Sequence, residues 1–394
     1  MAHEALVLLV INAGSSSVKF ALHDSAHPGT VILRGQLAGI GTGAVRTDLP
    51  AEAPDFGPLR EDADHADAID WLLEGLAAGG FSIVAVGHRV VHGGTRLSAA
   101  CRIDRTVEAE IERLIPLARS HNPHNLAAIR AVGKRWPALP QVACFDTAFH
   151  ATQPELATLL AVPRRFYDAG VRRYGFHGLS YQSVVARLGR GLEGGLPERT
   201  VIAHLGNGAS LCALADGKSV ATTMGFTPLD GLIMGTRPGL TDAGFILYLL
   251  EECGMNAGEI SDMLQRESGL LGLSGISGDM RVLEECDDAR ARFAIDAFCY
   301  RIVRETGSLA AALGGIDAFV FTGGIGENSA MIRARVMEGL AWLGAEPDPR
   351  ANGLKAGDSP LRITTADSRL SVYAIRTDEE GIIAAETARL ALAG

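Results

Sequence analysis

Arg89 stands among glycines and histidines in residues 87–94, GHRVVHGG, directly after the apolar stretch 81–86. At the end of a strand, a guanidinium can hold a phosphate or a carboxylate through two parallel hydrogen bonds. A solvated arginine is the simpler alternative. The flanking His88 and His92 and the paired glycines favour an anion-binding residue.

Two glycine-rich turns carry groups that suit a phosphate. In residues 10–20, VINAGSSSVKF, an apolar strand ends at Asn12, and the turn that follows can aim amides and hydroxyls at an anion, with Lys19 nearby. A plain hairpin turn remains the alternative. Residues 204–210, HLGNGAS, form the second such turn, and the equal lengths of GSSSVKFAL (14–22) and GNGASLCAL (206–214) suggest a duplicated domain. A Walker A loop is also disfavoured. The Gly-Lys-Ser at 217–219 has Cys212 where the first glycine of that motif belongs.

Carboxylates at two element boundaries are candidates for a metal. Asp146 follows an apolar strand in CFDTAFH (144–150), where it either caps the turn or positions Mg²⁺ or substrate. In RTDEEGII (376–383), Thr377 and Glu380 fit a capping box, which leaves Glu379 for a metal.

Three further segments point to a ligand. His177 precedes a predicted helix in RRYGFHGLS (172–180). Residues 224–239, MGFTPLDGLIMGTRPG, are predicted to be an exposed apolar loop whose one cation is Arg237, which favours a functional role. FTGGIGENS (321–329) is predicted to be strand, glycine turn and helix start, across which a nucleotide could lie. A dinucleotide fingerprint is disfavoured because no first βαβ unit surrounds it.

Strand-like and helix-like segments alternate, so the predicted class is α/β. Residues 41–64 are predicted to be a surface excursion, and a domain junction is expected near 147–170. The predicted strands are 6–12, 17–22, 142–146, 201–204, 210–214, 318–322 and 371–375. The predicted helices are 107–117, 126–134, 181–188, 242–252, 289–313, 330–343 and 379–392.

Length and charge narrow the class of protein. A chain of 394 residues favours two domains. The net charge of −10 argues against a nucleic-acid surface and against a polybasic membrane patch. The six scattered cysteines are expected to be reduced and mostly buried, and the short apolar start of the chain fits neither a membrane span nor a signal peptide. A cytoplasmic protein is predicted.

Taken together, eight strings in order resemble the acetate kinase family: INAGSSSVK, GHRVVHGG, FDTAFH, YGFHGLS, HLGNGAS, GFTPLDGLIMGTR, FTGGIGENS and TDEE, which span residues 11–380. The resemblance implies two duplicated actin-like ATPase domains with an active-site cleft between them. It places the N-terminal domain at 1–148 plus 380–394 and the nucleotide-binding domain at 149–379. It also implies ATP, Mg²⁺ (or Mn²⁺) and a homodimer.

The resemblance also assigns roles to residues. Arg89, Asp146, His177 and Arg237 match the catalytic set. The acid-binding wall corresponds to Val91, Ser120, Phe176 and Pro228, together with Arg89. Asn12 and Glu379 match the metal site. The ATP-binding positions correspond to Asn12, Ser15, Ser17, Lys19, His204, Asn207, Gly208, Asp279, Met280, Arg281, Gly324, Ile325 and Asn328.

The implied reaction is direct transfer of the γ-phosphoryl of ATP to acetate, which gives acetyl phosphate. Two positions depart from the family and leave the acyl-chain preference open. Arg119 and Ser120 stand where proline and leucine are usual, and Pro238-Gly239-Leu240 follow Arg237 in place of Ser-Gly-Asp. A propionate or butyrate kinase is therefore the nearest alternative, and a non-kinase actin-like ATPase is the more distant one.

Overall fold

The protein is described by a computed structural model that covers residues 6–14, 16–51 and 53–392. The chain divides into two compact units. The first comprises Met1–Phe149 with Asp378–Gly394, and the second comprises His150–Thr377. Within the described ranges, no helix is long and apolar enough to cross a membrane.

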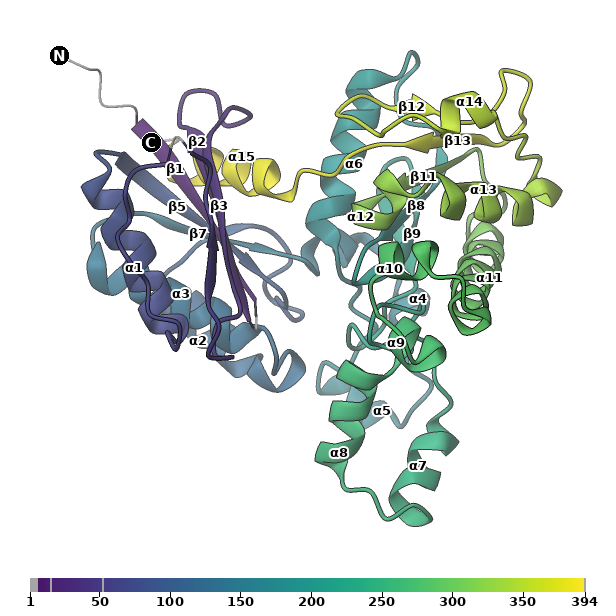
Figure 1. Cartoon of the computed structure of the whole chain (residues 1–394), viewed down its shortest axis with the longest axis horizontal. Helices are drawn as coiled ribbons and strands as arrows, with labels where there is room; N and C mark the ends of the chain where they lie inside the picture. The colour runs from purple at the N-terminus through teal and green to yellow at the C-terminus, as the bar shows by residue number, and fades with distance from the viewer. Residues whose placement is uncertain (1–5, 15, 52, 393–394) are drawn as a thin grey trace. The chain divides into compact units, whose positions relative to one another are not determined.

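The first unit is built on a seven-stranded sheet, ordered β4-β3-β2-β1-β5-β7-β6 (Figure 1). Strand β1 pairs antiparallel with β2 and parallel with β5, and β5 pairs parallel with β7. The carboxyl ends of β1, β5 and β7 therefore lie along one edge of the sheet. The strands are β1 (Leu6–Ala13), β2 (Ser17–Asp24), β3 (Val31–Ala38), β4 (Arg46–Asp48), β5 (Ser82–Val90), β6 (Cys101–Arg102) and β7 (Gln141–Phe145).

Helices cover this sheet because its central strands are apolar on both faces. Val7, Leu9 and Ile11 of β1 are buried with Leu72 and Leu76 of the first helix. The last helix returns to the same sheet, and a Cβ at Gly87 would lie 2.2 Å from the Thr387 hydroxyl, so glycine is needed at that crossing. The helices of this unit are α1 (His65–Ala78), α2 (Arg105–Arg113), α3 (Asn122–Arg135) and α15 (Glu379–Ala391).

The second unit repeats the same strand plan. Its six-stranded sheet is ordered β10-β9-β8-β11-β13-β12, with β8 antiparallel to β9 and parallel to β11. Strands β10-β9-β8-β11-β13 thus correspond one by one to β3-β2-β1-β5-β7. The strands are β8 (Arg199–Leu205), β9 (Ala209–Ala215), β10 (Lys218–Thr222), β11 (Ala318–Thr322), β12 (Leu361–Arg362) and β13 (Ser371–Ala374). The predicted duplication is therefore confirmed at the level of topology.

The helices of the second unit match their predicted bounds best where the apolar period is long. The longest, α11 (Ala289–Leu313), has its predicted bounds and ends at Gly314, whose φ of 68° is typical of a helix C-cap. The others are α4 (Glu155–Thr158), α5 (Arg164–Asp168), α6 (Gly178–Gly191), α7 (Ala243–Glu251), α8 (Ala257–Asp262), α9 (Gly269–Ser274), α10 (Met280–Glu285), α12 (Gly323–Asn328), α13 (Ala330–Gly339) and α14 (Pro349–Asn352).

Two predictions about the chain's surface were wrong. Residues 41–64 are not a plain surface excursion, because Val45, Leu49 and Phe56 pack against the core of the first unit. Residues 224–239 are not an exposed apolar loop either, since Met224, Leu232 and Met234 are fully buried. The loop is apolar because these residues form part of the core of the second unit.

For the cysteines, the prediction of free thiols was more accurate than the prediction that most of them are buried. Within the described part of the chain, all six cysteines are free, as expected. Only Cys144, Cys212 and Cys299 are buried, and Cys253 is exposed.

Candidate active site

Arg89, Asp146 and Asn12 come together at the carboxyl edge of the first sheet. Arg89 donates from Nε to Asp146 Oδ1 at 3.0 Å and from Nη2 to Asp146 Oδ2 at 2.5 Å. Its Nη1 donates to Asn12 Oδ1 at 3.2 Å. These bonds use three of the five guanidinium N–H groups, so two can still bind an anionic ligand.

Electrostatics fix the charge of this arginine. Burial opposes its positive charge, whereas Coulombic attraction to Asp146 and Glu379, with the hydrogen bond to Asp146, raises the pKa of Arg89 above its ordinary value. Arg89 is the penultimate residue of β5, so it lies within a strand and not on a loop. Both oxygens of Asp146 accept from Arg89, which indicates that this carboxylate positions the guanidinium and is not poised as a general base.

Two buried amides join the strand ends at this edge, and neither was predicted from the sequence as a site residue. Asn125 accepts from Val91 N at 3.1 Å and donates to Ala13 O at 2.7 Å, so it joins the ends of β1 and β5. Asn122 accepts from His92 N at 3.2 Å. Both come from the start of α3, and the string HNPHN, with two asparagines three residues apart, was the available signal.

The start of α15 differs from its prediction. The N-cap is Asp378, whose side chain accepts from Gly381 N at 3.1 Å, and no capping box involves Thr377 and Glu380. Glu380 instead pairs with Arg34, whose Nε lies 2.6 Å from Glu380 Oε2. Glu379 acts on Arg89 through Coulombic attraction, and its place at a metal remains a prediction.

The remaining predicted residues of the first unit have varied settings. Ser15 lies outside the described residues. Ser17 and Lys19 are at the start of β2, with Lys19 exposed and paired in register with Asn12. Val91 is buried, and the Ser120 hydroxyl lies 2.9 Å from His121 Nδ1.

In the second unit, His177 and Arg237 converge on Gly208 in the turn between β8 and β9. A Cβ at Gly208 would lie 3.1 Å from Arg237 Nη2 and 3.1 Å from His177 Nε2. His177 is the N-cap of α6 with a left-handed φ of 60°, and its ring stacks on His204 at 4.3 Å. Two nitrogen groups therefore face a position of the turn, Gly208, that has no side chain.

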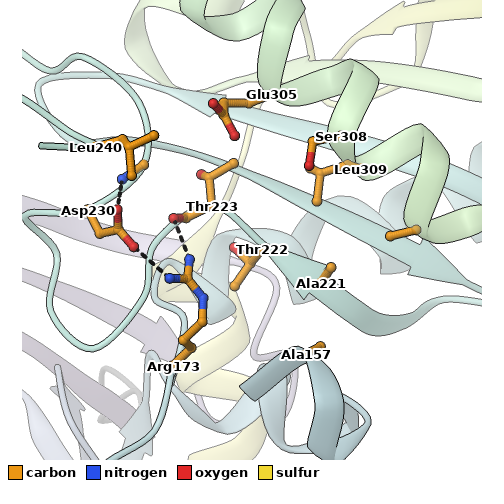
Figure 2. A pocket seen from close by; sticks show the side chains of 12 residues that line it. Ala157, Arg173, Ala221, Thr222, Thr223, Asp230, Leu240, Glu305, Ser308 and Leu309 are labelled. Carbon is orange, nitrogen blue, oxygen red and sulfur yellow. Dashed lines mark hydrogen bonds and ion pairs between the residues drawn. The ribbon is translucent and has the colours of Figure 1, made fainter. Parts of the chain in front are cut away.

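The loop that carries Arg237 and Pro228 is held at both ends. Arg237 Nη1 donates to Pro228 O at 2.9 Å. Arg173 Nη1 lies 2.9 Å from Asp230 Oδ2, and its Nη2 donates to Thr223 O at 3.3 Å (Figure 2). Arg173, Thr223 and Asp230 lie on the wall of a cavity of about 300 Å³, together with Thr222, Leu240 and Glu305. Arg173 thus anchors the loop, through Asp230, to Thr223 at the end of β10.

A larger cavity, of about 730 Å³, lies beside the second glycine turn. Seven predicted ATP-binding residues line it: Asn207, Asp279, Met280, Arg281, Gly324, Ile325 and Asn328. Gly206, Gly278, Glu284 and Ser329 also line it and were not predicted. His204 lies just before the turn, on β8, where Ser180 Oγ is 2.8 Å from its Nδ1.

The glycines around this cavity are needed for close approach. A Cβ at Gly235 would lie 2.2 Å from Asn207 Oδ1, so a side chain at this position would displace Asn207. Gly323 has a φ of 77°, and its N–H donates to Glu327 Oε1 at 3.0 Å, which fixes the turn between β11 and α12.

Among the described residues, no cluster of three or more histidine, cysteine or acidic side chains could hold a metal ion. The residues predicted to bind the acid are divided between the units: Val91 and Ser120 belong to the first, and Phe176 and Pro228 to the second. The predicted wall around the acid therefore remains a prediction.

Two sheets with the same strand order, each with a turn between its first antiparallel strands, define a protein with two duplicated actin-like ATPase domains. The sequence profile of the acetokinase family matches residues 7–385. The chain belongs to the acetokinase family.

Relatives agree with that assignment. The chain is 49% identical to an acetate kinase of Nitrobacter hamburgensis, with 98% of this chain and 96% of that protein covered. It is 50% identical to an acetate kinase of Rhodopseudomonas palustris, with coverages of 98% and 99%. Among solved structures, a propionate kinase from Francisella tularensis matches with a TM-score of 0.89 at 36% identity, covering 98% of this chain and all of that one. An acetate kinase from Porphyromonas gingivalis matches with a TM-score of 0.87 at 38% identity and the same coverages.

Proposed function

We propose that the chain is an acetate kinase that reversibly transfers the γ-phosphoryl of ATP to acetate by direct in-line displacement. The observation that carries the proposal is the cavity of about 730 Å³ beside the Asn207–Gly208 turn, on which Arg237 and His177 converge. It offers a nucleotide a binding place next to a cation and an imidazole. Relatives named acetate kinase at about half identity support the choice of acid.

The chemistry requires cations more than a base. A carboxylic acid with a pKa near that of glutamic acid, about 4.3, is already ionised at pH 7. The obstacle is repulsion between this carboxylate and the phosphates, which Arg89 and Arg237 reduce. In the transition state charge spreads over the equatorial oxygens, where guanidinium and imidazole N–H groups stabilise it.

Mg²⁺ is part of the proposal and fits the residues present. Asn12 and Glu379 would hold it, and both offer the oxygen ligands that Mg²⁺ prefers. Mg²⁺ is commonly bound through one or two carboxylates together with phosphates and water, so a small protein ligand set is sufficient. When bound, the ion neutralises charge on the phosphates, and Mn²⁺ would serve in the same way.

A hydroxamate assay with ATP, Mg²⁺ and acetate tests the proposal directly. Acetyl phosphate should form only when all three are present, and ADP should appear in equal amount. ATP hydrolysis that is independent of acetate would favour a non-kinase ATPase. Formation of product with propionate but not acetate would favour the propionate kinase alternative.

We also propose a homodimer formed through the second unit. Helix α7 is rich in large apolar residues, yet Phe245, Leu247, Tyr248 and Leu250 are between 41% and 55% exposed. A second copy is the occupant that fits, because a self-complementary apolar face closes with two-fold symmetry. Light scattering should give twice 41.4 kDa, and Tyr248→Glu should shift the mass toward the monomer, while Tyr300→Glu, an exposed change on α11, should not.

A cytoplasmic location, with no nucleic-acid or membrane partner, completes the proposal. Its support is the net charge of −10 and the free thiols of the described residues.

A further inference from the structure

The His177 ring is held from behind by two buried hydroxyl groups. Ser210 Oγ, on β9, lies 2.9 Å from His177 Nδ1. Tyr181 Oη, one helical turn after His177 on α6, lies 2.5 Å from the same Ser210 Oγ. Ser210 and Tyr181 are fully buried. The side chains of β9 and α6 therefore meet behind the imidazole, on the side away from Gly208.

Because Nδ1 is occupied by Ser210, Nε2 is the ring nitrogen that can contact a ligand. His177 Nε2 faces the turn glycine Gly208, close to Arg237 Nη2. The left-handed backbone of His177 and its stacking on His204 restrict the ring further. With Nδ1 held by a hydroxyl, the proton at Nε2 depends on which way that hydroxyl points.

The charge beside the ring favours one direction for these hydrogen bonds. Arg237 beside Nε2 disfavours a second positive charge, so the neutral imidazole is preferred in the free protein. A neutral imidazole can donate from Nε2 only if Nδ1 accepts. The Tyr181–Ser210 bond can run in either direction, and a Ser210 hydroxyl that accepts from Tyr181 has its own hydrogen free for His177 Nδ1.

We propose that Ser210 and Tyr181 are positioning residues that make His177 a neutral donor: Tyr181 donates to Ser210 and Ser210 donates to His177 Nδ1, so Nε2–H points at the transferred phosphoryl. The inference rests on the proposed kinase reaction. Burial raises the pKa of Tyr181 well above its ordinary value, so its hydroxyl stays protonated. No proton leaves the chain during transfer, because the imidazole only donates a hydrogen bond.

The tautomer can be measured without activity. In ¹⁵N-histidine-labelled full-length protein, long-range ¹H–¹⁵N spectra distinguish Nε2–H from Nδ1–H, and His177→Gln identifies the signal. We expect Nε2–H in the wild type and a mixture of tautomers in Ser210→Ala. An Nδ1–H tautomer, or a ring charged at pH 7.5, would overturn the proposal whatever the enzyme's substrate.

Kinetics supply the second readout. Ser210→Ala should lower kcat about 10–100-fold, the usual effect of losing an orienting partner, and leave both KM values within about threefold. Tyr181→Phe keeps the ring and should lower kcat several-fold, and Ser210→Thr should restore most of the loss. Ser180→Ala removes the matching hydroxyl from His204 and should change the KM for ATP more than kcat.

A control separates position from stability. Thr306→Val removes another fully buried hydroxyl, whose one hydrogen bond among the described residues is to Ile302 O within α11, and should leave kcat unchanged. If Ser210→Ala folds and keeps wild-type kcat, the positioning role is wrong. If the wild type itself makes no acetyl phosphate, the proposed function fails, and the tautomer measurement still decides the direction of the hydroxyl chain.

Discussion

Arg89 and Arg237 are both shielded cations, but the two units hold them in opposite ways. Arg89 lies in a strand, with its guanidinium clamped by the nearly inaccessible carboxylate of Asp146, 2% exposed. Arg237 lies on a loop, and among the described residues its guanidinium has no carboxylate within 4 Å and donates to a backbone carbonyl. Burial lowers the pKa of Arg237, whereas the pKa of Arg89 is raised.

The difference shows that charge can be prepared for a ligand in two ways. Arg89 is oriented before any ligand arrives, and part of its charge is already neutralised. Arg237 has no such carboxylate among the described residues, so an anion bound beside it would meet an unneutralised charge. The first unit thus provides a fixed donor, and the second provides an unneutralised one.

The largest expected effect separates these two roles. Arg89→Ala and Arg237→Ala should each lower kcat about 10²–10³-fold, the size of losing one electrostatic stabiliser. Only Arg89→Ala should also destabilise the fold, by about 3–5 kcal/mol, because it leaves the Asp146 carboxylate buried without its partner. Urea unfolding and steady-state kinetics on both variants measure this.

A double variant sharpens the test. Arg89→Ala with Asp146→Asn removes the stranded charge and should recover much of the lost stability without recovering kcat. Equal stability of Arg89→Ala and Arg237→Ala would mean that the Asp146 pair does not hold the first unit as described. Near-normal kcat in either single variant would remove that arginine from the mechanism.

Buried histidines allow the two units to be compared by pH. Burial lowers the pKa of His88 in the first unit and of His150 in the second to about 4, opposed by hydrogen bonds to Gln141 and to Phe176 O respectively. Because the folded pKa lies below the unfolded value of 6.5, this stability is present above pH 6.5 and is lost as pH falls toward 4. Each site contributes about 3 kcal/mol to that loss.

Unfolding in urea at pH 7.5, 5.5 and 4.5 checks this slope. His88→Gln and His150→Gln should each flatten it, and the exposed His27→Gln should not. A stability that stays constant between pH 7.5 and 4.5 would contradict the burial of both rings.

The two neighbouring glutamates at the start of α15 should also differ in role: Glu379 in metal dependence and Glu380 only in stability. Glu379→Gln should raise the Mg²⁺ concentration needed for half-maximal activity about tenfold, in the range for losing one metal ligand or its support. Glu380→Gln only weakens a pair with Arg34, whose side chain is 53% exposed, and should cost at most about 1 kcal/mol. Titration of activity with Mg²⁺ in both variants decides, and a reversed pattern would move the metal to Glu380.

The sequence predicted elements well where a signal is local. The apolar period of α11 and the continuous apolar run of β11 indicated their bounds. The glycine turns and the family resemblance together indicated seven residues that line the larger cavity. Pairings across the sheet were not predicted. Arg89 meets Asp146 only because β5 and β7 pair in parallel with Arg89 opposite Cys144, a register that no local pattern specifies.

The wrong capping box has a local cause. Thr377 and Asp378 are both good N-cap residues, and a helix start one residue later transfers the cap to Asp378. Asn122 and Asn125 were missed for a different reason. Buried amides that join strand ends are recognisable only once the distant strands are in place.

The smallest effect concerns Ser120, which is predicted to line the acid pocket and stands where the family resemblance predicts leucine. Serine has less apolar surface than leucine, and its hydroxyl already has a partner in His121 Nδ1, at 2.9 Å. A satisfied hydroxyl costs less to cover than an unpaired one, so the space beside the methyl group can accept a methylene. Burying that methylene gains about 0.8 kcal/mol, or roughly fourfold in kcat/KM for propionate. One methylene seldom discriminates by more than about 1–3 kcal/mol, so acetate should remain a good substrate, with propionate close behind.

Ser120→Leu should move the propionate-to-acetate ratio toward acetate, and the adjacent Arg119→Ala, an exposed change, should not. Measuring kcat/KM for both acids in all three proteins decides the matter: a ratio unchanged by Ser120→Leu would place Ser120 outside the acid pocket and return acyl-chain selection to Val91, Phe176 and Pro228.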